Sequence, residues 1–285
     1  MTALIRMPAE LRQACDHARA EGRRVGLVPT MGALHEGHLS LIEEAKTRAS
    51  FIVTTIFVNP LQFAPGEDLD RYPRTLQRDL DICAARDVDL VFAPERDAMY
   101  PRGFQSSVSV TALTRPLEGE FRPSHFDGVT TVVTKLFNLV GPCVAVFGRK
   151  DYQQWKILER MVRDLDMPFE VLGCPIVRES DGLALSSRNR YLSTEERKRA
   201  LTIVSALRSV HDAWRRGERR AHVIRSLAAE QIESGVDQVD YVAAVDPESL
   251  LRPEGSADRL LIAVAAHLGG TRLIDNVVLG EDPRP

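Results

Sequence analysis

Short apolar runs, separated by segments with a helical repeat, organise the first half of the chain. The run Phe51–Val58 is apolar or β-branched at every position and lacks the alternation of a strand with one wet face. Such a run is typical of a strand covered on both faces within a parallel sheet. Further strand-like runs are Val25–Pro29, Val88–Ala93, Cys143–Phe147 and Phe169–Leu172. We expect these runs to be strands of one sheet.

Three intervening segments have the pattern of helices: Gly37–Ser50, Thr75–Arg86 and about 152–165. In the second of them, the apolar residues fall on one helical face. Strand–helix alternation of this kind is typical of α/β proteins. The sequence therefore predicts a Rossmann-like, doubly wound parallel sheet.

The pattern changes after about residue 176. Ser193 and Glu196 have the spacing of a capping box at the start of a long helix, Thr194–Arg216, and a second helix is expected at about 220–234. Three strand-like runs follow without helices between them: Val239–Val245, Leu260–Ala265 and Arg272–Val278. Two helices and three strands predict a smaller α+β domain. We expect the domains to span 1–180 and 181–285.

Composition and charge narrow the class of protein. The 285 residues include 37 Lys and Arg against 40 Asp and Glu, a net charge of −3. This balance argues against a dedicated nucleic-acid or membrane-surface binder, although it permits a local basic pocket. The four cysteines lack metal-type spacing and indicate a reducing compartment. Without a signal segment or an apolar run of about 18–20 residues, a cytoplasmic protein with no membrane partner is expected.

The loop between the first strand and the first helix carries the most informative residues. His35 and His38 lie three positions apart, with Gly32 and Gly37 beside them. The loop lacks GxGxxG, has His38 in place of a P-loop lysine, and does not match HExxH. Two imidazoles at a helix N-terminus can donate hydrogen bonds to a phosphate, reinforced by the helix dipole and free backbone N–H groups. The alternative is a pair of surface or capping histidines.

Two later polar segments can likewise be interpreted either as parts of a ligand site or as solvated structural loops. Gly148–Asp151 follows a predicted strand, at the edge where open α/β sheets bind ligands. There Lys150 could hold a phosphate and Asp151 ribose hydroxyls, or the segment is an exposed turn with an N-cap aspartate. Leu185–Asn189 offers two hydroxyls and a guanidinium to a polyphosphate, or is a solvated loop.

In this order the segments resemble a known family. HxGH followed by a hydroxyl-plus-basic loop is similar to the HIGH and KMSKS motifs of the adenylate-forming nucleotidyltransferase superfamily. More narrowly, the chain resembles the pantothenate synthetase (pantoate–β-alanine ligase) family in the strings PTMGALHEGHLSLI, FVNPLQF, DLDRYPRTL, FDGVTTVVTKLFN, FGRKDYQQ and LALSSRNRYL. The resemblance runs from about Val25 to Leu192, with a fainter similarity in LIAVAAHLGGTRLIDNV.

The resemblance implies an ATP-dependent condensation in two steps. The carboxylate of (R)-pantoate attacks the α-phosphorus of ATP, which gives pantoyl adenylate and pyrophosphate. The amine of β-alanine then displaces AMP and forms pantothenate. ATP is thus a substrate, Mg²⁺ is expected with it, and a homodimer is expected from the family.

The resemblance also implies roles for individual residues. It implies catalytic roles for His38, as acid or transition-state donor, and for His35, Lys150, Ser186, Ser187 and Arg188. It implies ATP binding by Met31, Gly32, Ala33, Leu34, His35, Glu36, Gly37, His38, Gly148, Arg149, Lys150, Asp151, Val177, Leu185, Ser186, Ser187 and Arg188. Gln62 and Gln154 match pantoate ligands, with Gln62 also near the β-alanine position. Leu185 stands where the family commonly has methionine, so only a main-chain role transfers there.

Two other functions compete with this one. A different HxGH nucleotidyltransferase would act on a phosphorylated acceptor, which calls for Arg or Lys where this chain has Gln62 and Gln154. A non-catalytic nucleotide sensor or RNA-binding relative would bind nucleotide without turnover. As metal ligands, Asp79 and Asp81 are candidates, but a solvated helix face is favoured for both. His125 is expected to structure its loop.

Overall fold

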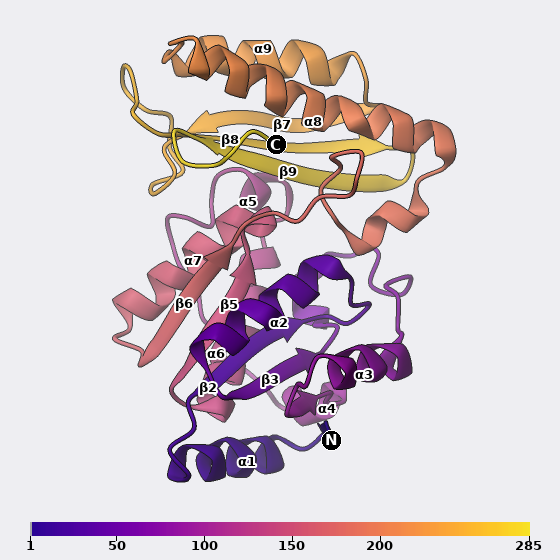
Figure 1. Cartoon of the computed structure of the whole chain (residues 1–285), viewed down its shortest axis with the longest axis vertical. Coiled ribbons are helices and arrows are strands. Elements are labelled where there is room, and N and C mark those ends of the chain that lie inside the picture. Colours follow the sequence, from indigo (N-terminus) through magenta and orange to yellow (C-terminus); the bar gives the residue numbers. More distant parts are fainter. Residues whose placement is uncertain (1) are drawn as a thin grey trace. The chain divides into compact units, whose positions relative to one another are not determined.

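The computed structural model describes residues 2–285, which form two compact units (Figure 1). The N-terminal unit runs up to Thr114 and includes Arg122–Arg149 and Gln154–Pro175. The C-terminal unit comprises Ile176–Pro285 together with two short segments from earlier in the chain, Arg115–Phe121 and Lys150–Gln153. Residues that are neighbours in sequence can therefore belong to different units.

The N-terminal unit contains a six-stranded sheet in the order β1-β4-β3-β2-β5-β6, with parallel pairing throughout. The strands are β1 (Ala3–Ile5), β2 (Val25–Thr30), β3 (Phe51–Ile56), β4 (Leu90–Phe92), β5 (Cys143–Gly148) and β6 (Phe169–Cys174). All five predicted strands are confirmed, and β1 is an additional one. The strand order reverses between β2 and β5, and open α/β sheets bind ligands beyond the strand ends at such a reversal.

Helices cover both faces of this sheet. They are α1 (Pro8–Ala20), α2 (Glu36–Arg48), α3 (Leu76–Ala85), α4 (Arg96–Met99), α6 (His125–Val140) and α7 (Tyr152–Asp164), the last beginning in the C-terminal unit. Alternate strand residues enter two apolar cores: Leu27 and Val53 pack with α1, α6 and α7, whereas Val28 and Ile52 pack with α2 and α3. This doubly wound arrangement confirms the predicted fold class.

The C-terminal unit contains an antiparallel sheet in the order β7-β8-β9. Its elements are α5 (Glu118–Phe121), α8 (Thr194–Arg215), α9 (Ala221–Glu233), β7 (Gln238–Val245), β8 (Leu260–Leu268) and β9 (Thr271–Leu279). Leu207 of α8, Ile224 of α9 and Ile262 of β8 share one core. At the start of α8, Ser193 Oγ accepts from Glu196 N at 3.3 Å and the Glu196 carboxylate accepts from Ser193 N at 2.7 Å. These hydrogen bonds confirm the predicted capping box. The two long helices and the three strands confirm the predicted α+β pattern.

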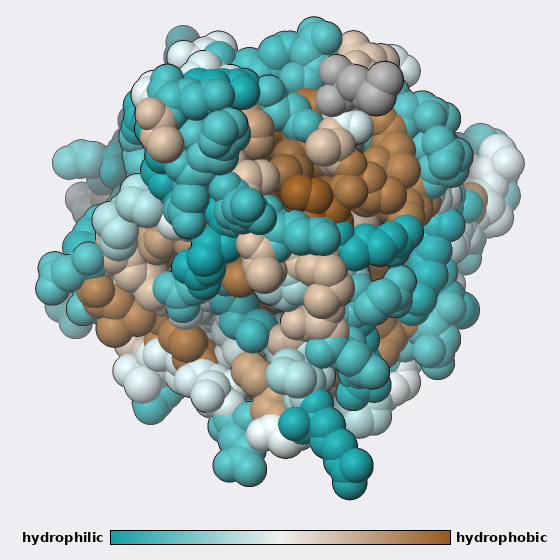
Figure 2. Space-filling model, turned by 90° about the horizontal axis from the view of Figure 1, so that it is seen from below, coloured by the Kyte–Doolittle hydropathy of each residue, from teal (hydrophilic) through white to brown (hydrophobic). Residues whose placement is uncertain are grey.

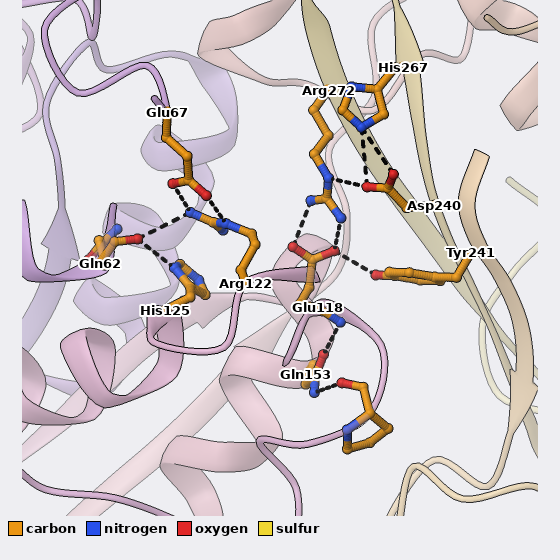
Figure 3. Close-up of polar contacts among 11 residues, drawn as sticks. Gln62, Glu67, Glu118, Arg122, His125, Gln153, Asp240, Tyr241, His267 and Arg272 are labelled. Atoms are coloured by element: carbon orange, nitrogen blue, oxygen red, sulfur yellow. Dashed lines mark hydrogen bonds and ion pairs between the residues drawn. The ribbon is translucent and has the colours of Figure 1, made fainter. Parts of the chain in front are cut away.

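A network of charged and polar side chains joins Arg115–Phe121 to the C-terminal sheet (Figure 3). Arg272 of β9 donates to both carboxylate oxygens of Glu118 at 2.7 and 2.8 Å, and through Nε to Asp240 at 2.7 Å. The Tyr241 hydroxyl donates to Glu118 at 2.8 Å, and burial, together with Glu118, raises its pKa well above the ordinary value. Gln153 completes the network, because its amide oxygen accepts from Glu118 N at 3.1 Å.

Within residues 2–285, no helix combines the length and the apolar character needed to cross a membrane.

Candidate functional site

The two histidines of the predicted ATP loop cap the helix that follows it. His35 is the N-cap of α2, and its Nδ1 accepts from Gly37 N at 3.2 Å. The Nδ1 atom of His38 accepts from His35 N at 3.3 Å. The two rings lie against each other, with centroids 4.1 Å apart. Together they form a capping box in which imidazoles take the place of the usual hydroxyl and carboxylate.

This arrangement determines which ring nitrogen can donate. A neutral imidazole that accepts at Nδ1 carries its proton on Nε2. Both rings are therefore hydrogen-bond donors at Nε2. The expectation of free backbone N–H groups here is wrong for His35 and Gly37, because the rings cap both of them. The capping and the ligand-binding interpretations are compatible, since each uses a different nitrogen.

Asp79 lies beneath the loop rather than on a solvated face of α3, so the sequence-based expectation for it is wrong. Its side chain is fully buried, and its carboxylate accepts from Ala33 N and Leu34 N, each at 2.9 Å. Asp81 is exposed, as expected, and accepts from Gln77 at 3.0 Å. Over residues 2–285, no group of three or more His, Cys, Asp or Glu side chains is arranged to hold a metal ion.

Gln62 ends the 3-10 turn η1 (Pro60–Gln62), a short distance after β3. The buried Asn59 donates from Nδ2 to Gln62 Oε1 at 3.1 Å and to Gly128 O at 3.0 Å. Asn59 Oδ1 in turn accepts from Tyr100 Oη at 2.8 Å. Gln62 Nε2 lies 3.1 Å from the sulfur of Met31, at the start of the histidine loop. The structure thus brings Gln62 and the histidine loop together.

The main chain of Gln62 is fixed by residues far along the sequence (Figure 3). Its carbonyl oxygen accepts from Arg122 Nη2 at 3.2 Å and lies 2.9 Å from Nδ1 of His125. Arg122 also donates to both carboxylate oxygens of Glu67 at 2.7 Å. Burial alone would raise the pKa of Glu67, but the hydrogen bond and charge of Arg122 prevail and lower it. His125 therefore contacts the main chain of the loop at Gln62, and this contact holds the loop in place.

The segment after β5 contributes to both units. Gly148 and Arg149 belong to the N-terminal unit, Lys150 and Asp151 to the C-terminal unit, and Gln154 to the N-terminal unit again. The Arg149 guanidinium lies 5.6 Å from the ring centroid of Trp155. The carbonyl oxygen of Lys150 accepts from Asn276 Nδ2 of β9 at 2.9 Å. This hydrogen bond attaches the Lys150 turn to the C-terminal sheet.

A small hairpin in the C-terminal unit carries the predicted phosphate loop. Leu185 N donates to Val177 O at 3.0 Å, so these two positions, both expected to bind ATP, lie together. Gly182 has φ +98°, which only a glycine adopts easily at the hairpin turn. Ser186 caps the 3-10 turn η3 (Ser187–Tyr191) by accepting from Arg188 N at 3.2 Å.

The hairpin and the Lys150 turn are held by consecutive residues of β9. Arg178, next to Val177, forms an ion pair with Asp275 at 2.7 and 2.9 Å. The neighbouring Asn276 holds the carbonyl of Lys150. The C-terminal unit thus brings the hairpin together with Lys150 and Asp151, the second half of the segment after β5 that is expected to bind ATP.

Comparisons with known proteins decide the family. A family model described as pantoate-beta-alanine ligase matches residues 3–278. The chain is 51% identical over 280 residues to the pantothenate synthetase of Geotalea uraniireducens, covering 98% of this chain and 99% of that protein. This chain belongs to the pantoate–β-alanine ligase family. Membership confirms the resemblance seen in the motif strings, and the match extends beyond Val25–Leu192 in both directions.

Solved structures of pantoate–β-alanine ligases have the same fold. The pantothenate synthetase from Thermus thermophilus aligns with a TM-score of 0.92 at 46% identity, over 97% of this chain and 99% of that one. The ligase from Francisella tularensis, complexed with β,γ ATP and β-alanine, aligns with a TM-score of 0.81 at 31% identity over 100% of both chains.

Some supporting residues of this ligase fold were missed by sequence reasoning. Their hydrogen bonds reach residues far along the sequence: Asp79 to Ala33 at a separation of 46 positions, Arg122 to Gln62 at 60 and Asn59 to Gly128 at 69. The one local signal was Asn59 directly before Pro60, a residue pair that favours the start of a turn.

Proposed function

We propose that this chain condenses (R)-pantoate with β-alanine, using ATP, and releases pantothenate, AMP and pyrophosphate. The observation that carries this proposal is the family match across residues 3–278. The full-length alignment with a ligase complexed with β,γ ATP and β-alanine supports it. A pantoyl adenylate is the intermediate we infer, because a carboxylate lacks the leaving group that an amine needs to displace.

In the first step, negative charge develops on the oxygens around the α-phosphorus. Nε2–H of His38 donates to these oxygens, and His35 contacts a neighbouring phosphate. Donors fixed in advance help most where charge develops in the transition state. The Nδ1 caps support this assignment, because they hold each ring in one tautomer and one orientation.

Other residues take the roles that the family resemblance implies. Gln62 and Gln154 bind pantoate, whose hydroxyls and carboxylate need both donors and acceptors. Lys150 contacts a phosphate, Asp151 the ribose and Val177 the adenine. Ser186, Ser187 and Arg188 bind ATP phosphates and pyrophosphate. The remaining proposed ATP contacts are Met31, Gly32, Ala33, Leu34, Glu36, Gly37, Gly148, Arg149 and Leu185.

Mg²⁺ accompanies ATP in this proposal. Mg²⁺ is usually held by substrate phosphates, waters and one or two carboxylates rather than by a cage of protein ligands. The metal would neutralise charge on the triphosphate.

We further infer that the protein is a cytoplasmic homodimer. The two units of each chain act as its domains. The four cysteines are buried free thiols, which suits a reducing compartment. Figure 2, which views the molecule from the side of α1, shows apolar surface among polar residues. Leu4 and Met7, at the start of the chain, are exposed apolar side chains that a second copy could cover. Light scattering tests the dimer, and a monomer at assay concentrations would contradict it.

The function is tested by ATP–pyrophosphate exchange with pantoate and without β-alanine. We expect exchange that depends on pantoate, and pantothenate formation once β-alanine is added. β-Alanine alone should support no exchange. If pantoate fails to support exchange in a folded preparation, this chain does not carry out the proposed first step. A nucleotide sensor would bind ATP and show neither reaction.

A further inference from the structure

Asp79 makes an unusually complete set of contacts with the histidine loop. Each of its carboxylate oxygens accepts one backbone N–H: Oδ2 from Ala33 and Oδ1 from Leu34, both at 2.9 Å. The Thr75 hydroxyl donates to Oδ2 at 3.1 Å. Three donors thus compensate for the burial of a side chain that has no exposed surface. A carboxylate with these contacts fixes the backbone that supplies them.

The backbone it fixes is in an uncommon conformation. Gly32 has φ +84° and Ala33 has φ +52°, so two consecutive residues lie in the left-handed region. For a residue with a Cβ, that region costs about 1–2 kcal/mol. A Cβ added at Gly32 would lie 3.1 Å from Asp79 Oδ2, which shows how closely the loop approaches the carboxylate. Binding of the next two N–H groups by Asp79 offsets the strain at this turn.

The turn leads directly into the histidine pair. Leu34 is followed by His35, the N-cap of α2, whose backbone N–H donates to His38 Nδ1. A change in the direction of the Ala33 and Leu34 peptides therefore moves both rings. The same hydrogen bonds direct the N–H groups of Ala33 and Leu34 at Asp79, away from a bound phosphate.

We propose that Asp79 is a positioning residue for His35 and His38. Its carboxylate fixes the Gly32–Leu34 turn and thereby the direction in which both Nε2–H groups point. Asp79 itself touches no substrate. The catalytic consequence rests on the proposed function, whereas the effect on ring geometry does not.

The test compares two substitutions on one helix. Asp79→Asn keeps the shape but offers only one oxygen, and its NH₂ group faces a backbone N–H. Asp81→Asn removes the same charge two positions along, from an exposed side chain. We expect Asp79→Asn to lower the rate of pantoate-dependent exchange about 10²-fold, the scale for a displacement of about 1 Å at reacting groups. Asp81→Asn should leave the rate unchanged.

A second readout separates positioning from general loss of stability. In protein labelled with ¹⁵N-histidine, the ring nitrogens of His35 and His38 report tautomer and hydrogen bonding. Asp79→Asn should shift these signals and leave those of His17, His211 and His222 in place. Exchange that falls while both rings keep their wild-type signals would overturn the proposal, and so would unchanged exchange.

Two further outcomes are distinguishable. If Asp79→Asn does not fold, Asp79→Glu takes its place in the test. This variant keeps the charge and both oxygens but adds a methylene, and it should displace the same two ring signals. Unmoved ring signals in that variant would also overturn the proposal. If the wild-type chain shows no pantoate-dependent exchange, the proposed function fails, while the ring signals still test what Asp79 positions.

Discussion

Arg272 and Glu118, 154 positions apart, form a two-point ion pair at 2.7 and 2.8 Å within the C-terminal unit. Their side chains are only 22% and 9% exposed. Loss of one partner from such a pair leaves the other charge in a poorly solvated place, at a cost of about 3–5 kcal/mol. The pair therefore secures Arg115–Phe121 to β9.

Arg272→Ala should destabilise the C-terminal unit by about 3 kcal/mol, because it removes the cation that pairs with both Glu118 and Asp240. The chain has two tryptophans, and Trp214 lies in the C-terminal unit. Urea unfolding followed by Trp214 fluorescence in a Trp155→Phe background reports this unit. Arg284→Ala, which breaks an exposed ion pair with Asp212, is the control and should change the transition little. Equal shifts for the two variants would contradict the prediction.

Glu67 should make the N-terminal unit more stable at neutral pH than in acid. Arg122 holds the pKa of Glu67 below its ordinary value of 4.5 despite the opposing effect of burial. The unfolded chain then binds the proton more readily, so this contribution is present above pH 4.5 and is lost as the pH falls through the folded-state value. Unfolding free energies of wild type and Glu67→Gln, measured from pH 7 to pH 3, should converge in acid. A constant difference would rule this out.

His38 accepts a hydrogen bond at Nδ1 and, in the proposed function, donates one at Nε2, and different substitutions should separate these two roles. In His38→Asn, Oδ1 can replace Nδ1 as the acceptor for His35 N, but the Nε2 donor is lost. In His38→Gln, the amide N–H can take the place of Nε2–H, but the cap is lost. We expect the asparagine variant to keep its melting temperature and lose about 10²–10³-fold in adenylation rate.

The glutamine variant should instead lose about 1 kcal/mol of stability, the usual net value of one hydrogen bond, and retain part of the rate. Thermal melts and pyrophosphate exchange measure the two effects. If both variants lost rate and stability in the same proportion, the two nitrogens would not have separate functions.

Gly128→Ala should disturb the position of Gln62, the proposed pantoate ligand. A Cβ there would lie 2.3 Å from Leu61 O and 2.6 Å from Gln62 N. Alanine gains about 1 kcal/mol in helix propensity, but overpacking costs about 1–3 kcal/mol, so a net loss is expected. Displacement of Gln62 should raise KM for pantoate about tenfold, which corresponds to 1.4 kcal/mol. Gly270→Ala, with no atom near the added Cβ, is the control and should leave KM unchanged.

The sequence predicted elements well where burial leaves a simple pattern. Phe51–Ile56 is a central strand covered on both faces, and its continuous apolar run shows this directly. Helix α6 was not assigned, because its run of Val and Thr resembles a strand and its residues are buried on most sides.

Hydrogen bonds between residues far apart in the sequence leave no comparable pattern of apolar and polar positions. Asp79 is a polar residue in an amphipathic helix, and only the fold reveals that two loop amides point at it. The motif strings located His35 and His38 correctly at a helix N-terminus. The use of Nδ1 for capping depends on ring orientation, which residue spacing does not determine.

The path of the chain also limits how this protein can be recombined. The chain changes unit five times, after Thr114, Phe121, Arg149, Gln153 and Pro175. A chimaera of two family members spliced once at residue 176 would join β9 from one parent to the Glu118 and Lys150 segments of the other. Arg272 and Asn276 would then have to match foreign partners. A working exchange of the C-terminal region needs three transplanted pieces, with Arg115–Phe121 and Lys150–Gln153 moved alongside it.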